Sequence, residues 1–155
     1  MLSATAEHAV RAVLLLARYM GNKALSADTI AAELGAPRNY LAKTLNALAK
    51  DGIVHSARGA AGGFTLAIAP AELTLARVIR PFDEHTRTPA CLLRNQGCDP
   101  ANPCAIHDTW QSVVGHAAAW FEQTTVAQLL ASAGDVSYVP PAVVASSDRE
   151  LAHAN

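Results

Sequence analysis

Residues 26–66 decide the fold, and they read SADTIAAELGAPRNYLAKTLNALAKDGIVHSARGAAGGFTL. Ser26 is placed as the N-cap of a short helix that ends at Gly35, because glycine is the usual residue just past a helix end. Pro37 takes the first-turn position of a second helix that runs to about Asp51. The inward positions of this second helix are Leu41, Leu45 and Leu48. Two helices joined by a short Gly-Ala-Pro turn predict a helix-turn-helix.

Two β-prone stretches, residues 53–57 and 64–68, flank the glycine-rich segment 58–63 and predict a hairpin. A helix-turn-helix followed at once by a hairpin is the order of elements in a winged helix. Apolar periodicity predicts further helices at residues 3–20, 74–82, 103–123 and 124–131. The predicted fold class is therefore mainly α: a winged helix-turn-helix with a small β-hairpin wing plus a long C-terminal dimerisation helix.

The length of 155 residues fits one ordinary domain with a protruding element or tail. We divide it into a winged-helix DNA-binding domain at 1–82 and a cysteine-containing sensor loop at 83–104. A dimerisation helix and a terminal helix follow at 104–132, and a flexible tail at 133–155. The apolar stripe of the long helix calls for a partner helix, and it consists of Ile106, Trp110, Val113, Val114, Ala117 and Phe121. We expect Trp110 and Trp120 to pack in the core or in a dimer.

Charge is unevenly placed along the chain, although the net charge is only −1. Residues 1–66 carry seven Lys or Arg against four Asp or Glu, a net +3, and the remainder sums to −4. A basic half suits a module that meets phosphates on one side. No apolar run reaches the length of a membrane span and no signal peptide is apparent, so we expect a soluble cytoplasmic protein. No nucleophile with a base and no phosphate-binding loop points to an enzyme.

The outer face of the second helix of the helix-turn-helix carries residue types that bind DNA grooves, namely Arg38, Asn39, Lys43, Asn46 and Lys50. Arg38 and Asn39 are the predicted base readers, whereas Lys43 and Lys50 would grip phosphates. At the hairpin tip Arg58 would enter the minor groove, since Gly59, Gly62 and Gly63 leave room for it. The alternatives are a solvated helix face and an ordinary turn.

Three cysteines and one histidine form a cluster with ligand-like spacing: Cys91, Cys98, Cys104 and His107, separated by six, five and two residues. The odd number of cysteines and the absence of a secretory context argue against a disulfide framework. With Asn102 as the N-cap, Cys104 and His107 would lie one turn apart on one face of the long helix. Residue types alone leave an iron-sulfur cluster, zinc and bare redox thiols all open.

Three features together resemble the Rrf family of bacterial winged-helix regulators: Tyr40-Leu41, the wing string 56–64 and the three cysteines before a long helix. The resemblance covers about residues 1–132 and implies a homodimer with crossing long helices. It also implies that Cys91, Cys98 and Cys104 bind a cluster with His107 as in IscR-like members. In NsrR-like members an acidic residue of the partner's first helix replaces this histidine, where this chain has Glu7. Two departures from IscR-like members are six rather than five residues between the first two cysteines, and Ala42 in place of a DNA-discriminating Glu.

The sequence thus predicts a DNA-binding transcription regulator that senses iron, redox or nitric oxide status. A repressor is favoured over an activator. A two-iron two-sulfur cluster is the favoured cofactor, with a four-iron four-sulfur cluster or zinc as alternatives. The predicted partners are double-stranded promoter DNA and a second copy of the chain, with no membrane. The alternative functions are a zinc- or thiol-based winged-helix adaptor that binds a protein, and a thiol redox regulator without a cluster.

Overall fold

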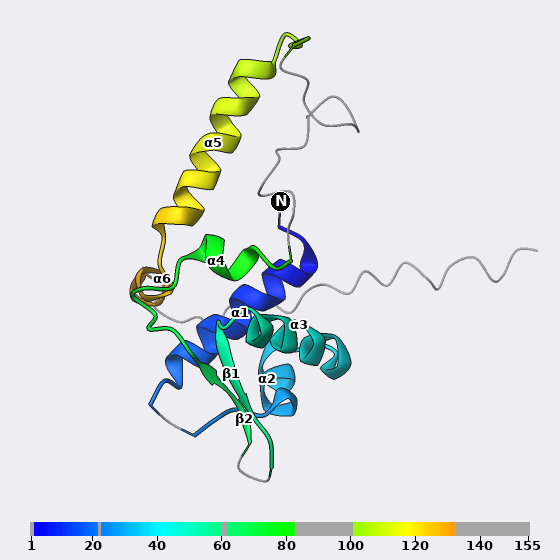
Figure 1. Cartoon of the computed structure of the whole chain (residues 1–155), viewed down its shortest axis with the longest axis vertical. Coiled ribbons are helices and arrows are strands. Elements are labelled where there is room, and N and C mark those ends of the chain that lie inside the picture. The colour runs from blue at the N-terminus through cyan, green and yellow to red at the C-terminus, as the bar shows by residue number, and fades with distance from the viewer. Residues whose placement is uncertain (1, 22, 60–61, 83–100, 133–155) are drawn as a thin grey trace, which may run out of the picture.

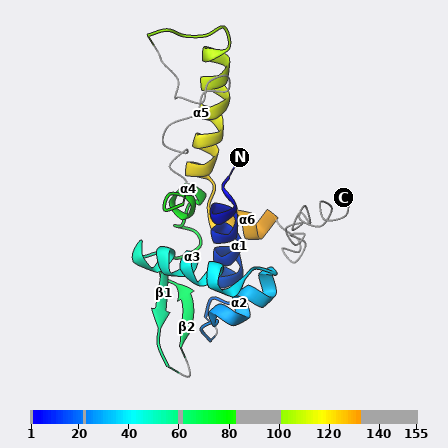
Figure 2. The same ribbon diagram turned by 90° about the vertical axis from the view of Figure 1, so that its right-hand side faces the viewer.

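The structure is a computed structural model that describes residues 2–21, 23–59, 62–82 and 101–132. The helix-turn-helix and the hairpin lie at one end of the molecule, and a long helix extends from the other end (Figures 1 and 2). In chain order the elements are α1 (Ala4–Arg18), α2 (Ala27–Leu34), α3 (Arg38–Lys50), β1 (Val54–Ala57), β2 (Gly63–Leu66), α4 (Leu75–Ile79), α5 (His107–Gln123) and α6 (Val126–Ser132). This order confirms the predicted mainly helical winged-helix fold.

Local capping explains where the first helices begin and end. The Oγ of Ser3 accepts a hydrogen bond from the Ala6 N–H, and the Oγ of Ser26 accepts one from the Thr29 N–H. Gly35 ends α2 in the left-handed conformation with φ 60°, which a residue with a Cβ adopts only with strain. Pro37 is the N-cap of α3 rather than part of its first turn, one residue away from the predicted position.

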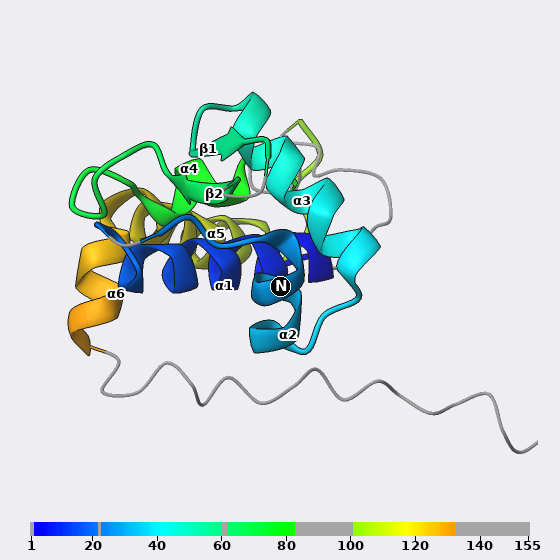
Figure 3. The ribbon, with the colours of Figure 1, turned by 90° about the horizontal axis from the view of Figure 1, so that it is seen from below.

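The core lies between α1, α2 and α3, with α1 in the centre and α3 and the hairpin along one side of it (Figure 3). The inward face of α3 is fully buried, as its leucine spacing predicts. α6 also packs on α1 through Val126. The largest side chains of this core are Ile30, Leu41, Leu45, Leu48, Ile53 and Leu73, each at most 1% exposed.

The hairpin is attached to the rest of the domain by a third backbone segment. β1 and β2 pair antiparallel, with Val54 opposite Leu66 and Ala57 opposite Gly63. On its other side β2 is bridged to Leu25, which donates its N–H to the Phe64 carbonyl at 3.1 Å and accepts from the Phe64 N–H at 2.8 Å. The wing therefore projects from a fixed base beside the start of α2.

The long helix α5 begins later than the sequence predicts. Asn102 is not its N-cap, because the helix starts at His107 after Ile106, which offers no side-chain cap. The His107 N–H binds the Cys104 carbonyl at 3.0 Å, and this i,i+3 bond is that of a turn rather than of an α-helical ladder. Cys104 consequently lies ahead of the helix, although it remains one turn from His107.

Among the described elements, α5 packs mainly on α4. Near the C-terminal end of α5, Phe121 packs against the buried Leu75 and Ile79 of α4. No residue of α5 is buried, and Val113 and Trp120 are 54% and 52% exposed. Trp120 is therefore not part of the core of this chain, which leaves dimer packing as its predicted role. Within the described ranges, no helix is both long and apolar enough to cross a membrane.

Candidate nucleic-acid interface

α3 presents an uninterrupted polar face on the side away from the core. Steps of four, three and four residues place Asn39, Lys43, Asn46 and Lys50 along one side of the helix, and all four are exposed. The buried leucines occupy the opposite side. The structure therefore brings together the residues of α3 that the sequence predicts to contact DNA. Arg38 is also exposed and lies beside Asn39 at the N-terminal end of α3.

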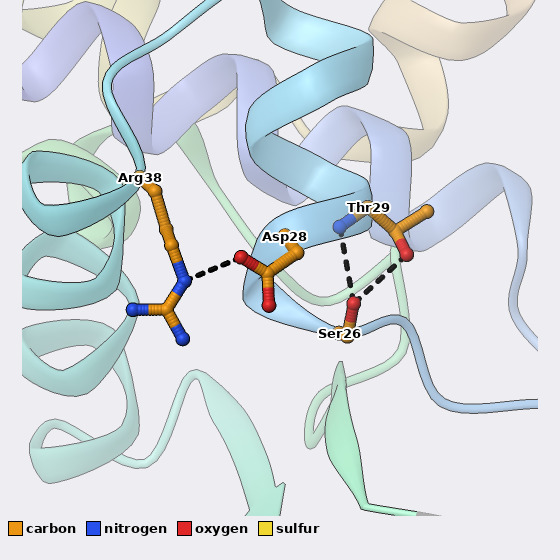
Figure 4. A network of polar contacts seen from close by, with 4 residues as sticks. All are labelled: Ser26, Asp28, Thr29 and Arg38. Carbon is orange, nitrogen blue, oxygen red and sulfur yellow. Dashed lines mark hydrogen bonds and ion pairs between the residues drawn. The ribbon is translucent and has the colours of Figure 1, made fainter.

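Arg38 has a partner that the sequence reasoning missed. Its Nε donates to the Oδ1 of Asp28, which lies in the first turn of α2 (Figure 4). The two residues are ten positions apart and belong to different helices, so no local pattern links them. Both side chains are largely exposed, at 61% for Arg38 and 66% for Asp28.

A second missed contact joins the start of α3 to α1. The hydroxyl groups of Tyr40 and Thr5 share a hydrogen bond, and the Tyr40 ring packs edge-on against His8 with centroids 5.3 Å apart. The His8 Nδ1 lies 2.7 Å from the Ala4 carbonyl oxygen. The first turns of α1 thus hold the side chain of the residue that follows Asn39, one of the two predicted base readers.

The glycines of the wing have backbone roles that the structure makes visible. Gly59 turns the chain with φ 102°, and a Cβ on Gly62 would come within 2.4 Å of the Ala57 carbonyl oxygen. A Cβ on Gly63 would lie 2.6 Å from the Leu25 carbonyl oxygen, at the bridge that anchors the hairpin. These glycines let the wing fold, and Arg58 is the exposed cation that they leave at its tip.

The predicted sensor residues are described only in part. Cys104 is partly exposed and carries a free thiol, and His107 lies one turn beyond it. Cys91 and Cys98 lie outside the described residues. No group of three or more His, Cys, Asp or Glu side chains converges within the described ranges. Glu7, the alternative ligand, forms an ion pair with Arg11 along α1.

Residues 2–132 match the model of the Rrf2 family, described as "Iron-dependent Transcriptional regulator". The chain belongs to the Rrf2 family. A helix-turn-helix (HTH) transcriptional regulator of Aquifex aeolicus is 31% identical to this Rrf2 protein over 126 residues, which cover 78% of this chain and 88% of the relative. The regulator IscR of Aliivibrio salmonicida is 26% identical over 129 residues, covering 83% and 76% of the two chains.

Two solved structures are similar to the Rrf2 protein. IscR of T. potens is 26% identical, covers 86% of this chain and 88% of its own, and superposes with a TM-score of 0.68. The global cysteine regulator CymR of B. subtilis is 24% identical, covers 85% of this chain and 97% of its own, and superposes with a TM-score of 0.72. The second likeness shows the shared fold alone. This Rrf2 protein is thus a DNA-binding transcription regulator of the helix-turn-helix type.

Proposed function

We propose that this Rrf2 regulator represses promoters in the cytoplasm and senses iron, redox or nitric oxide status through an iron-sulfur cluster. The observation that carries the proposal is the presence of two features in one chain. One is the exposed polar face of α3 beside an anchored wing, and the other is the soft donor pair Cys104 and His107 at the start of an exposed helix.

The DNA contacts follow from the exposed side chains. α3 enters the major groove, where Arg38 binds guanine and Asn39 binds adenine with paired hydrogen bonds. Lys43 and Lys50 hold phosphates on either side, and Asn46 lies between them on the same face. At the wing, Arg58 enters the minor groove, and Gly59, Gly62 and Gly63 allow the backbone to approach closely.

A second copy of the chain completes the molecule through α5. Its exposed Val113 and Trp120 are seven residues apart and so lie on the same side of the helix, together with Ala117. Large apolar side chains left half exposed on a projecting helix are typical of a surface that another helix covers. A dimer would present two α3 helices to two half-sites of one operator.

The donor set suits an iron-sulfur cluster held by Cys91, Cys98, Cys104 and His107. Cys104 and His107 lie one turn apart at the N-terminus of α5, where negative charge is favoured, which supports their role as two of the ligands. When bound, the cluster supplies a centre that changes oxidation state or is lost. Two iron and two sulfide ions are favoured, with four and four or zinc as alternatives and Glu7 as an alternative ligand in place of His107.

The decisive experiment is metal and sulfide analysis of protein purified without air. We expect a brown protein with visible thiolate-to-iron absorption, iron and near-stoichiometric sulfide, and a gel shift on promoter DNA that changes when the cluster is removed. His107→Ala should lower cluster retention, whereas the exposed His116→Ala on the same helix should not. A colourless protein with one zinc, or promoter binding that is unaffected by cysteine-to-serine substitutions and iron removal, would overturn the proposal.

A further inference from the structure

The contact between Asp28 and Arg38 joins two rigid backbone positions. The Ser26 Oγ accepts from the Thr29 N–H at 3.0 Å and lies 2.8 Å from the Thr29 hydroxyl, so the first turn of α2 that carries Asp28 is held from within (Figure 4). The turn into α3 is also fixed, because the Ala36 N–H binds the Ala31 carbonyl at 3.0 Å. These hydrogen bonds hold the backbone at both ends of the contact between Asp28 and Arg38.

This ion pair contributes little to stability. Both side chains are more than half exposed, and solvent screens such pairs so strongly that most add almost nothing to the free energy of folding. The pair nevertheless involves the side chain that projects from the first position of α3, the end of a recognition helix that reaches base edges. Its effect should therefore appear in DNA recognition rather than in folding.

The atoms in the contact leave the recognising part of Arg38 available. A guanidinium carries five N–H donors in one plane, and Asp28 engages the one on Nε. The two Nη groups carry the other four, and two of these N–H groups are enough to bind O6 and N7 of guanine. A carboxylate that accepts from Nε restricts the movement of the guanidinium and leaves its outer edge unoccupied.

We propose that Asp28 is a positioning residue that orients Arg38 for guanine recognition, an inference that rests on the proposed role of Arg38 in base reading. An arginine side chain has several rotatable bonds, and ordering it on binding lowers affinity. Asp28 orders it before DNA arrives. Because the benefit exists only where Arg38 meets its base, Asp28 acts on sequence preference at one position and not on general affinity.

The test compares Asp28→Asn with Glu33→Gln, which removes the same charge from the exposed C-terminal part of α2. The probes are the operator selected by the wild-type protein from random-sequence DNA, all single-base variants of it, and one unrelated duplex. Arg38→Ala first identifies the guanine at which preference depends on Arg38. At that position Asp28→Asn should reduce the preference for guanine about 3- to 10-fold, the range that ordering one long side chain supports. Glu33→Gln should leave it unchanged.

Each outcome of the test supports or overturns the proposed role of Asp28. Unchanged guanine preference in Asp28→Asn would overturn the inference while leaving Arg38 as a base reader. An equal rise in binding to every duplex would show that Asp28 only repels phosphates, and would overturn it as well. If Arg38→Ala alters no base preference, or the wild-type protein selects no operator, the proposed function of α3 is wrong and the inference fails with it. Thermal unfolding of both variants within a few degrees of wild type excludes a general loss of structure.

Discussion

The two ends of this molecule differ in how much of their apolar surface the chain itself covers. At the winged-helix end, Leu41, Leu45 and Leu48 are completely buried. At the other end, α5 is the longest helix of the described residues, and none of its side chains is buried. The winged helix thus buries its apolar face within one chain, whereas α5 leaves large apolar side chains such as Val113 and Trp120 about half exposed.

This difference has an energetic meaning. Full burial of a large apolar side chain stabilises a protein by about 1.5–3 kcal/mol, a gain that the α3 leucines obtain and that Val113 and Trp120 largely lack. A long helix also gains most of its stability from packing its apolar face. We therefore expect the winged helix to hold its fold alone and α5 to depend on a second copy.

The largest effect should come from a charge on the exposed side of α5. Val113→Asp is expected to give a monomer and to weaken operator binding by about 100-fold or more, because two linked half-sites bind far more tightly than one. Ala119→Asp adds the same charge on the side of the helix that carries His116 and Glu122, away from the apolar stripe, and should remain dimeric. Analytical ultracentrifugation and fluorescence anisotropy measure both quantities. If the Val113→Asp protein is dimeric and binds the operator with full affinity, the proposal that α5 depends on a second copy is wrong.

A core substitution should also have a large effect, but on the free energy of unfolding rather than on dimerisation and DNA affinity. Leu45→Ala removes a fully buried side chain and is expected to lower the free energy of unfolding by about 2–5 kcal/mol. Urea denaturation measures the loss, which should not depend on protein concentration when tested in the Val113→Asp background. A loss below about 1 kcal/mol would mean that this end is less tightly packed than its burial indicates.

Two glycine substitutions should change the stability of the protein in opposite directions. Gly63→Ala pushes a methyl group against the Leu25 carbonyl and should destabilise the protein by about 1–3 kcal/mol, with loss of the hairpin anchor. Gly115→Ala on α5 meets no atom within 4 Å and should stabilise the helix by about 0.5–1 kcal/mol. Thermal unfolding of the two variants compares them directly. The same sign for both would contradict the structure at Gly63.

The smallest effect should be at the start of α2. Ser26→Ala loses the hydrogen bond from the Thr29 N–H and should destabilise the protein by about 1 kcal/mol. Thr109→Ala, on the exposed first turn of α5, where Ile106 provides no cap bond, should change stability by less than about 0.5 kcal/mol. Chemical denaturation resolves the difference. Equal losses would indicate that capping does not distinguish the two helix starts.

The sequence predicted those elements whose causes are local. The serine cap and the left-handed glycine of α2 lie within a few residues of the backbone groups that they satisfy, so both could be predicted. The start of α5 was predicted wrongly, because Asn102 and Pro103 suit a helix start and yet the chain forms a turn there before His107. The candidate site was predicted in its α3 residues, since their spacing alone decides which face is polar.

The sequence alone determined the winged-helix order and the polar face of α3, because caps, glycines and side-chain periodicity act over a few residues. Tertiary structure decided three other features: that Asp28 reaches Arg38, that Gly63 must lie against Leu25, and that Val113 and Trp120 of α5 stay about half exposed. These depend on distances between segments far apart in the chain. Such distances exist only once the helices have packed, and therefore no local pattern encodes them.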